Sequence, residues 1–495
     1  MARKNKIAVI GSGLGGLSAA ARLAARGFDV DVFEKSAVSG GKAGEVSVAG
    51  YRFDTGPSVL TMKFVLEDLF SEIGEKLEDY LAVEPMDIHC RYFYSDGTII
   101  DAYSGFERLA SEFHKKTGTG RQELNRYFDY CRRIYDLTKD IFLMQSLMEL
   151  KTYANFDALR TLIKIKNIDS FRTMHEANSE YFSDKRIIQL FDRYATYNGS
   201  SPYKAPATLN IIPHVEYTMG SYYVREGIRS IPLSIEKAAA KKGVKFYFNT
   251  QVDKIVCRKN KVTGIIACGK EYNYDAVISN CDVNNTYKNL LEGGGSFFAE
   301  KYKNLEPSSS ALVFLWGIRG MNPSLQAHNI LFSENYRNEF EQLFTFMQCP
   351  DDPTVYIHIS SKYKFDDAPS GNENWFVMIN APAAGTVPDW KKEALRMKEI
   401  IQKKIKGMLG IDLGSHIAYE KIITPEDIER NTGSFRGSIY GISSNSRFAA
   451  FLRQSNRSRR YRGLFFAGGS AHPGGGIPLV LLSGKIVSRM VGEML

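Results

Sequence analysis

A glycine-rich turn between an apolar run and a helical pattern constrains this chain more than any other feature. The run Ile7-Ala8-Val9-Ile10 leads into Gly11-Ser12-Gly13-Leu14-Gly15-Gly16, and a helical pattern then continues to Arg26. In such a turn the first glycine allows the sharp bend, the second lets backbone N–H groups approach a pyrophosphate, and the third lets the helix pack on the strand. The positive end of the helix dipole then faces the phosphates. The sequence therefore predicts a dinucleotide site at this turn.

An acidic residue supports the same interpretation. Glu34 ends the next apolar run, Asp29-Val30-Asp31-Val32-Phe33, where a carboxylate accepts hydrogen bonds from a ribose hydroxyl. Because a carboxylate repels a 2′-phosphate, NADP is not expected at this site. The alternative is a glycine-rich turn in an α/β unit that binds nothing.

Composition indicates a globular protein of two to three domains. The chain has 495 residues, of which 44% are hydrophobic and 24% charged. Its 27 Tyr and 30 Phe suit a protein that encloses a large apolar ligand, although composition alone favours the simpler explanation, an aromatic-rich core. The six cysteines form no C-x-x-C pair, so we expect reduced thiols. The basic start Met1–Lys6 runs into a strand, which predicts a cytoplasmic protein without a signal peptide.

Charge and hydropathy limit the expected partners. The net charge of +9 comes with no nucleic-acid-binding motif, so no nucleic-acid partner is expected. No window reaches the ~20 apolar residues of a spanning helix, which restricts any membrane contact to the surface. Residues 141–166 combine apolar and basic positions, as in an interfacial helix or an ordinary surface helix. An arginine-rich stretch predicts a solvated loop, with an anionic lipid or phosphate contact as the alternative: Arg453, Arg457, Arg459, Arg460 and Arg462.

A second glycine-dense turn lies near the end of the sequence. The apolar run Leu464-Phe465-Phe466-Ala467 leads into Gly468-Gly469, and His472-Pro473-Gly474-Gly475-Gly476-Ile477-Pro478 opens an apolar helix. A strand, a glycine turn and a helix N-terminus thus recur, which predicts a second polar or anionic ligand group here. The alternative is a tight connection between two core elements.

Five motifs together identify a family resemblance. Besides the first turn with Glu34 and the closing turn, they are Gly40-Gly41-Lys42-Ala43-Gly44, the run Phe53 to Met62 (FDTGPSVLTM), and the run Ser200 to Ala207 (SSPYKAPA). The chain resembles the flavin-dependent carotenoid desaturases of the bacterial phytoene desaturase type. Within that family, Asp54 to Met62 and Leu481 to Lys485 are most similar to the hydroxycarotenoid 3,4-desaturases. Phytoene or diapophytoene desaturases share nearly every motif and remain the alternative.

The resemblance implies an α/β fold with FAD as cofactor. The expected fold is a discontinuous, doubly wound, Rossmann-like FAD-binding domain with a mixed sheet-and-helix substrate domain, as in flavin amine oxidases. The FAD-binding domain is expected from residues 1–75, 222–290 and 441–495. A membrane-associated helical region is expected over 76–221 and the substrate domain over 291–440. Peripheral association with the inner membrane is implied as well.

The resemblance also implies which residues bind FAD. They lie at the two glycine turns, around the ribose-binding acid, and on two segments between them: Gly11, Gly13, Leu14, Gly15, Gly16, Glu34, Lys35, Gly41, Lys42, Pro57, Ser58, Val252, Gly468, Gly469, Ile477 and Pro478. Val252 would contact adenine through its backbone. The closing turn would lie along the ribityl chain and the ring.

The implied reaction removes two hydrogens from adjacent carbons of a carotenoid, with hydride transfer to flavin N5 and oxygen or a quinone as terminal acceptor. The cation left behind is delocalised along the polyene, so a weak proton acceptor suffices. Asp54, His472 and Glu216 are the candidates for accepting or relaying that proton. Asp54 is equally suited to stabilising a turn, and His472 to bonding its own loop. The sequence has no serine nucleophile elbow and no metal-ligand spacing, so neither hydrolysis nor a metal is expected.

Two rival functions remain open. A flavin amine oxidase would resemble both ends of this chain, but that family usually carries an acid where Gly469 stands. A non-catalytic prenyl-binding protein on the same scaffold would need no redox cofactor. A flavin absorption band that bleaches on reduction separates this binder from the enzymes.

Overall fold

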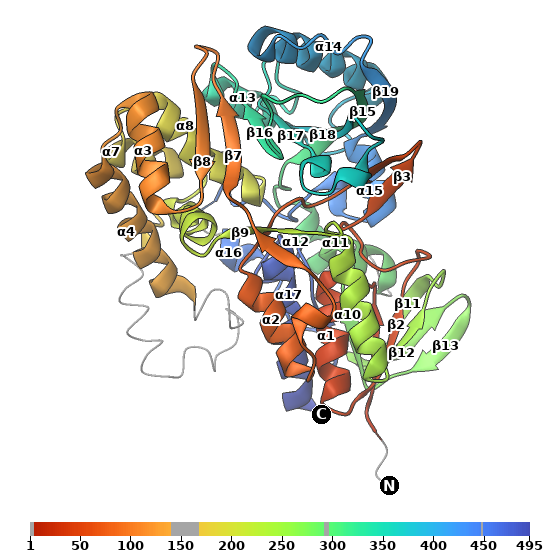
Figure 1. Cartoon of the computed structure of the whole chain (residues 1–495). Helices are drawn as coiled ribbons and strands as arrows, with labels where there is room; N and C mark the ends of the chain where they lie inside the picture. The colour runs from red at the N-terminus through yellow and green to blue at the C-terminus, as the bar shows by residue number, and fades with distance from the viewer. Residues whose placement is uncertain (1–3, 140–167, 292–296, 447–448) are drawn as a thin grey trace.

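A five-stranded parallel sheet occupies the lower part of the molecule in Figure 1, close to both termini. The computed structural model describes residues 4–139, 168–291, 297–446 and 449–495, so the predicted amphipathic segment 141–166 lies outside the described residues. The strand order is β10-β2-β1-β14-β20. These strands come from distant parts of the chain: β1 (Lys6–Ile10), β2 (Asp29–Phe33), β10 (Lys245–Tyr247), β14 (Ala276–Ser279) and β20 (Leu464–Phe466). The expected discontinuous doubly wound α/β fold is confirmed.

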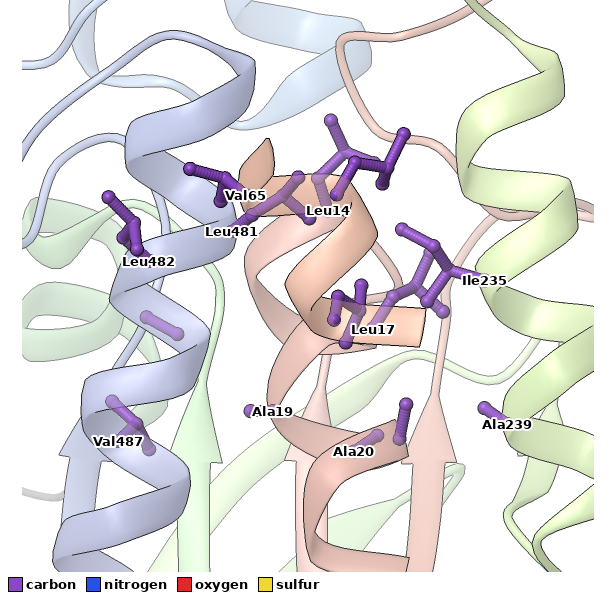
Figure 2. Packing of buried hydrophobic residues seen from close by; sticks show 14 of the residues in the cluster. Leu14, Leu17, Ala19, Ala20, Val65, Ile235, Ala239, Leu481, Leu482 and Val487 are labelled. Atoms are coloured by element: carbon purple, nitrogen blue, oxygen red, sulfur yellow. The ribbon is translucent and has the colours of Figure 1, made fainter. Parts of the chain in front are cut away.

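Helices from the beginning, the middle and the end of the chain pack together beside this sheet. They are α1 (Leu14–Ala25), α2 (Lys63–Glu72), α10 (Ser230–Lys241) and α17 (Ile477–Met494). Figure 2 shows Leu17 and Ala20 of α1 facing Ile235 and Ala239 of α10, with Val487 of α17 on the opposite side. All five side chains are fully buried. Each fully buried Val, Leu or Ile side chain stabilises a fold by roughly 1.5–3 kcal/mol. The cluster therefore anchors α10 and α17 to α1, the helix that starts at the first glycine turn.

A seven-stranded sheet forms the upper body in Figure 1. Its order is β19-β15-β18-β17-β16-β7-β8, antiparallel except where β16 and β7 run parallel. The strands are β7 (Ile88–Phe93), β8 (Ile99–Tyr103), β15 (Ser310–Arg319), β16 (His328–Leu331), β17 (Val355–His358), β18 (Asn372–Ala381) and β19 (Ile417–Ile423). Helix α14 (Trp390–Leu409) covers one face through Trp390, Met397 and Ile401.

The opposite face of this sheet is turned toward the rest of the molecule. Tyr51 and Phe53 from the hairpin of β3 (Glu45–Val48) and β4 (Tyr51–Asp54) pack there against Leu315 and Phe376. A helical region lies against β7 and β8 at the left of Figure 1. It contains α3 (Phe106–Thr117), α4 (Arg121–Thr138), α7 (Met174–Tyr181), α8 (Lys185–Asp192) and a π-helical turn at His214–Thr218. Within the described residues, no helix is both long and apolar enough to span a bilayer.

Two small sheets and several short elements complete the described structure. One sheet joins β5 (Leu60–Thr61), β9 (Ser221–Val224) and β6 (Val83–Pro85), and the other joins β11 (Val252–Arg258), β12 (Lys261–Ala267) and β13 (Lys270–Asn273). The shorter helices are α9 (Ile211–Pro213), α11 (Val283–Asn285), α12 (Phe297–Lys303), α13 (Tyr336–Phe344), α15 (Pro425–Thr432) and α16 (Ala449–Leu452). Strand β9 ties the end of the helical region to the segment that precedes α2.

Candidate functional site

The first glycine turn has the geometry that a bound pyrophosphate requires. Gly11 has a φ of +93°, and its N–H donates to the Phe33 carbonyl at 2.8 Å. A Cβ on Gly16 would lie 2.3 Å from the Gly11 carbonyl oxygen, so only glycine fits there. Helix α1 begins after Gly13 without any side-chain cap and without an acidic residue in its first turn. Its first N–H groups are therefore suited to an anionic ligand.

Glu34 is held rigidly beside this turn. Its Oε2 accepts hydrogen bonds from the backbone N–H of Ser12 at 2.8 Å and from the Ser12 hydroxyl at 2.9 Å, and its Oε1 accepts from the Ser36 N–H at 2.9 Å. A carboxylate has about four acceptor positions, so three donors leave capacity for a ribose hydroxyl. The chain leading to Val252 is joined to the same region, because Thr250 N–H donates to the Glu34 carbonyl at 2.8 Å.

The segment around Gly41 and Lys42 lies against the turn from the other side. Gly40 forms a bridge with Gly13, and a Cβ on Gly41 would be 3.5 Å from the Gly13 Cα. The Lys42 ammonium donates to the carbonyls of Ser438 and Ile439, both at 2.8 Å. Burial lowers the pKa of Lys42 to about 8. Lys42 thus places a cation next to the glycine cradle, while the predicted Lys35 is exposed.

The closing glycine turn meets the first one. A Cβ on Gly15 would lie 2.8 Å from the backbone nitrogen of Gly468, whose own φ is +106°. Helix α17 starts at Ile477, with Pro478 in its first turn and no side-chain cap. One cradle is therefore surrounded by the two glycine turns, Gly41 and Glu34. A Cβ on several of these glycines would enter the space between the turns. These residues fit a dinucleotide such as FAD.

Two predicted residues of the middle segment lie further along. Pro57 and Ser58 follow β4, and the Ser58 hydroxyl is 2.6 Å from the Tyr356 hydroxyl on β17.

Gly469 follows Gly468, and its carbonyl accepts from the Arg453 guanidinium at 2.9 Å. The closing turn is therefore held by a cation that the sequence interpretation placed elsewhere.

Arg453 corrects the prediction of a solvated arginine loop. It is 6% exposed, and it also donates to the carbonyls of Tyr440 at 3.0 Å and Ile442 at 3.2 Å. Burial lowers the pKa of Arg453 to about 10. Arg459, Arg460 and Arg462 are exposed as expected. The prediction was wrong for Arg453 because composition does not show that three carbonyls from neighbouring loops converge on one guanidinium.

Each candidate proton acceptor has hydrogen-bond partners of its own. Asp54 accepts from Arg52 at 2.8 Å and from the Ile228 N–H at 3.3 Å, and burial raises the pKa of Asp54. Its contacts are those of a residue that joins β4 to the start of α10. Glu216, at 2% exposure, accepts from the Tyr194 and Tyr197 hydroxyls, both at 2.6 Å.

His472 lies in the closing loop. Its backbone N–H donates to the Gln454 carbonyl at 2.9 Å, and its carbonyl accepts from Asn456 and from the Ser483 hydroxyl, both at 2.8 Å. The structure thus uses the backbone of this residue to fasten the loop to α17. The role of its imidazole in proton transfer stays a prediction.

Asn280 is a site residue that sequence reasoning missed. Its side-chain nitrogen would lie 2.6 Å from a Cβ on Gly13, and its Oδ1 2.7 Å from one on Gly15. Its backbone N–H donates to the Ile10 carbonyl at 2.9 Å, which holds it at the end of β14 beside the end of β1. The available signal was its position directly after a buried strand, at the carboxyl edge where ligands of such sheets bind.

Comparison with known proteins places this cradle in a family. The family model described as flavin containing amine oxidoreductase matches residues 14–491. The chain belongs to this family. Membership confirms the predicted cofactor, FAD, and the predicted class of enzyme, an FAD-dependent oxidoreductase.

Among this flavin oxidoreductase's relatives, carotenoid enzymes are prominent. A 1-hydroxycarotenoid 3,4-desaturase from Flavobacterium sp. is 42% identical over 486 residues, covering 98% of this chain and 99% of the relative. A 4,4′-diaponeurosporene oxygenase from Staphylococcus haemolyticus is 33% identical over 492 residues, covering 99% and 98%. The predicted resemblance to carotenoid desaturases is confirmed.

Solved structures show the same fold at low identity. An oxidoreductase from Methanosarcina mazei superposes with a TM-score of 0.64 at 16% identity, covering 98% of this chain and 100% of that one. Cyclohexylamine oxidase from Brevibacterium oxydans gives a TM-score of 0.60 at 12% identity, covering 99% of each chain. These likenesses establish that the flavin oxidoreductase adopts an amine oxidase-like fold.

Proposed function

We propose that this flavin oxidoreductase is a carotenoid desaturase that introduces the 3,4 double bond into a long, acyclic, hydroxylated polyene. The observation that carries the proposal is the 42% identity to a 1-hydroxycarotenoid 3,4-desaturase along 98% of the chain. The diaponeurosporene oxygenases at about a third identity support a carotenoid substrate more broadly.

In this proposal the protein binds, orients and shields, while FAD supplies the two-electron acceptor when it is bound. The glycine turns and Glu34 hold the cofactor, and the N-terminus of α17 supplies positive potential at the closing turn. The buried face of the seven-stranded sheet excludes water from the polyene. A strong base is not needed, because conjugation delocalises the charge that hydrogen removal creates along the chain. Asp54, Glu216 and His472 remain proposed acceptors or relays for the proton.

We also propose peripheral association with the cytoplasmic face of the inner membrane, and oxygen or a quinone as terminal acceptor. A long apolar polyene partitions into lipid, so an enzyme that takes it up gains access at a membrane surface. Flotation with vesicles of anionic and of neutral lipid tests the association. Reoxidation of the photoreduced enzyme by oxygen and by a soluble quinone tests the acceptor.

The decisive experiment is turnover of a defined carotenoid. FAD-loaded protein is incubated with a monohydroxylated acyclic carotene, and the products are separated and analysed by absorption and mass. The proposal expects a red-shifted product that has lost two hydrogens. A product that gains oxygen instead would assign the protein to the oxygenases. Turnover of an amine with no reaction of any carotene would refute the proposal in favour of an amine oxidase.

A further inference from the structure

Three of the eight histidines of the chain lie on neighbouring strands of the seven-stranded sheet. They are His89 on β7, His328 on β16 and His358 on β17, and all three are buried. His328 and His358 are directly paired across their strands, with their rings stacked 4.6 Å apart. We call these three residues the histidine row.

The row faces the interior rather than helix α14. His328 shares its side of β16 with Ile330, which packs into the helical region, whereas Leu331 packs under α14. On β7 a bulge between Ile88 and Cys90 inserts His89, which then packs edge-on against Tyr217 of the π-helical turn at 5.2 Å. Bulges of this kind redirect a side chain next to functional sites. His89 and His328 therefore lie on the same interior side of the sheet.

Each of these two imidazoles has one nitrogen that is bonded and one that is not. His328 Nδ1 is 2.7 Å from the Tyr356 hydroxyl, and His89 Nδ1 pairs with the Ser221 hydroxyl. Among the residues described, neither His328 Nε2 nor His89 Nε2 has a hydrogen-bond partner. The two histidines are only 2% and 4% exposed, respectively. A buried polar atom without a partner is costly, and one reason to retain it is a ligand that supplies the missing bond.

One consistent set of hydrogen-bond directions gives the two unpaired Nε2 atoms opposite roles. If Ser58 donates to Tyr356 at 2.6 Å and Tyr356 donates to His328 Nδ1, then His328 carries its proton on Nε2 and offers a donor. If Ser221 donates its one proton to the Met86 sulfur at 3.5 Å, its oxygen accepts from His89 Nδ1–H. The Nε2 atom of His89 is then an acceptor.

Burial keeps both rings in the neutral form that this arrangement needs. Burial lowers the pKa of His89, and burial together with His358, His89 and Arg193 holds the pKa of His328 well below its usual value. The negative charge of Glu216 acts in the opposite direction and raises the pKa of His89, by less than burial lowers it. Glu216 is itself paired with Arg193 at 3.6 Å.

We propose that His328 and His89 recognise the hydroxyl group of the substrate, with His328 Nε2–H donating a hydrogen bond to its oxygen and His89 Nε2 accepting a hydrogen bond from its O–H. The inference rests on the proposed function and adds the residues that select a hydroxylated polyene. In a 1-hydroxycarotenoid oxidised at the 3,4 bond, the hydroxylated carbon is two bonds from the nearer reacting carbon. The recognition site must therefore lie close to the reacting bond. Ser58, which is predicted to contact FAD, is linked to His328 by hydrogen bonds through a single residue, Tyr356.

The first test varies the substrate and leaves the protein unchanged. Binding to the FAD-loaded enzyme is titrated with three acyclic carotenes that differ at one position, carrying a hydroxyl, its methyl ether or hydrogen. The hydroxyl satisfies both imidazoles, the ether only His328, and the hydrocarbon neither. We expect affinity to fall in that order. The hydroxylated carotene should bind roughly 10-fold or more tightly than the hydrocarbon. Equal affinity for all three overturns the inference.

The second test varies the protein. His328→Leu and His89→Leu are expected to lower the ratio of kcat/KM for hydroxylated over unhydroxylated carotene by about 10- to 100-fold. His328→Gln retains an amide donor and is expected to restore part of the preference. The exposed His416→Leu is the matched control and keeps the wild-type ratio. Variants that load FAD, melt like the wild type and keep its ratio overturn the inference.

The two hypotheses fail in different ways. Wild-type enzyme that desaturates both carotenes equally leaves the proposed function standing and removes the hydroxyl recognition. Wild-type enzyme that neither binds nor converts any carotene removes the proposed function, and hydroxyl recognition with it.

Discussion

The contact between the two glycine turns makes Gly15→Ala the most informative substitution outside the histidine row. A Cβ at this position would lie 2.7 Å from the Asn280 Oδ1, 2.8 Å from the Gly468 nitrogen and 3.0 Å from the Gly468 Cα. The Asn280 amide can rotate away, but Gly468 is backbone. Its N–H donates to the Ser483 hydroxyl at 3.2 Å, and the N–H of the preceding Ala467 donates to the Ser279 carbonyl at 3.0 Å. The closing turn therefore has little freedom to move.

The magnitude follows from two opposing effects. Replacing a helical glycine with alanine is favourable by about 1 kcal/mol, because it restricts the unfolded chain. Overpacking a rigid contact costs about 1–3 kcal/mol. We therefore expect Gly15→Ala to lose up to ~2 kcal/mol of stability. Because separating the turns distorts the cradle, FAD affinity is expected to fall at least ~10-fold, which corresponds to 1.4 kcal/mol.

Gly407→Ala is the matched control. Gly407 also lies in a helix, α14, but it is exposed and a Cβ there would meet nothing within 4 Å. We expect this variant to melt at or slightly above the wild-type temperature and to bind FAD normally. Thermal melting of the FAD-free proteins and fluorescence titration with FAD measure both effects. If Gly15→Ala melts like Gly407→Ala and keeps wild-type FAD affinity, the two turns do not meet as described.

Three further predictions test other parts of the structure. Glu34→Gln replaces one carboxylate oxygen with a donor facing an N–H of Ser12 or Ser36, so the FAD Kd is expected to rise about 10-fold or more; an unchanged Kd in a fluorescence titration would refute the role of this acid. Arg22→Met removes a fully buried guanidinium that pairs with Glu72 and should cost about 1–3 kcal/mol in urea unfolding, whereas a loss below ~0.5 kcal/mol would contradict it. Burial lowers the pKa of His358 to about 4. As the pH falls from about 6.5 to about 4, this histidine is protonated in the unfolded chain but not in the folded one, so stability is lost. His358→Gln should flatten the dependence of melting temperature on pH in this window, and an unaltered dependence would exclude this imidazole as a source.

The sequence was most informative where a function depends on neighbouring residues. The strand, turn and helix around Gly11 to Gly16 lie within one short stretch, and backbone conformation alone explains the need for glycine there. Glu34 could be predicted for the same reason. It directly follows β2, which pairs with the strand before the turn, so its position beside the turn is fixed. The closing turn was predictable from its glycines and the helix that follows.

Residues that act at a distance were not predictable in this way. Arg453 was assigned to a solvated stretch because four more arginines follow it, yet it alone is buried against the carbonyls of Tyr440, Ile442 and Gly469. Asn280 had no distinguishing motif, and only the pairing of β14 with β1 brings its side chain over the turn. Asp54 and Glu216 remain predicted proton acceptors, and their hydrogen-bond donors come from residues that no local pattern specifies.

The sequence by itself determined the conformation of the two glycine turns and the position of Glu34 beside the first of them, because dihedral freedom at glycine and the charge of one carboxylate are local properties. Tertiary structure decided which buried polar groups are satisfied and which are left open. His89 and His328 are far apart in the sequence, and they share one interior face only because β7 pairs with β16 in a particular register and carries a bulge at His89. Strand register is set by the packing of the whole sheet, so the face that a side chain occupies follows from long-range contacts.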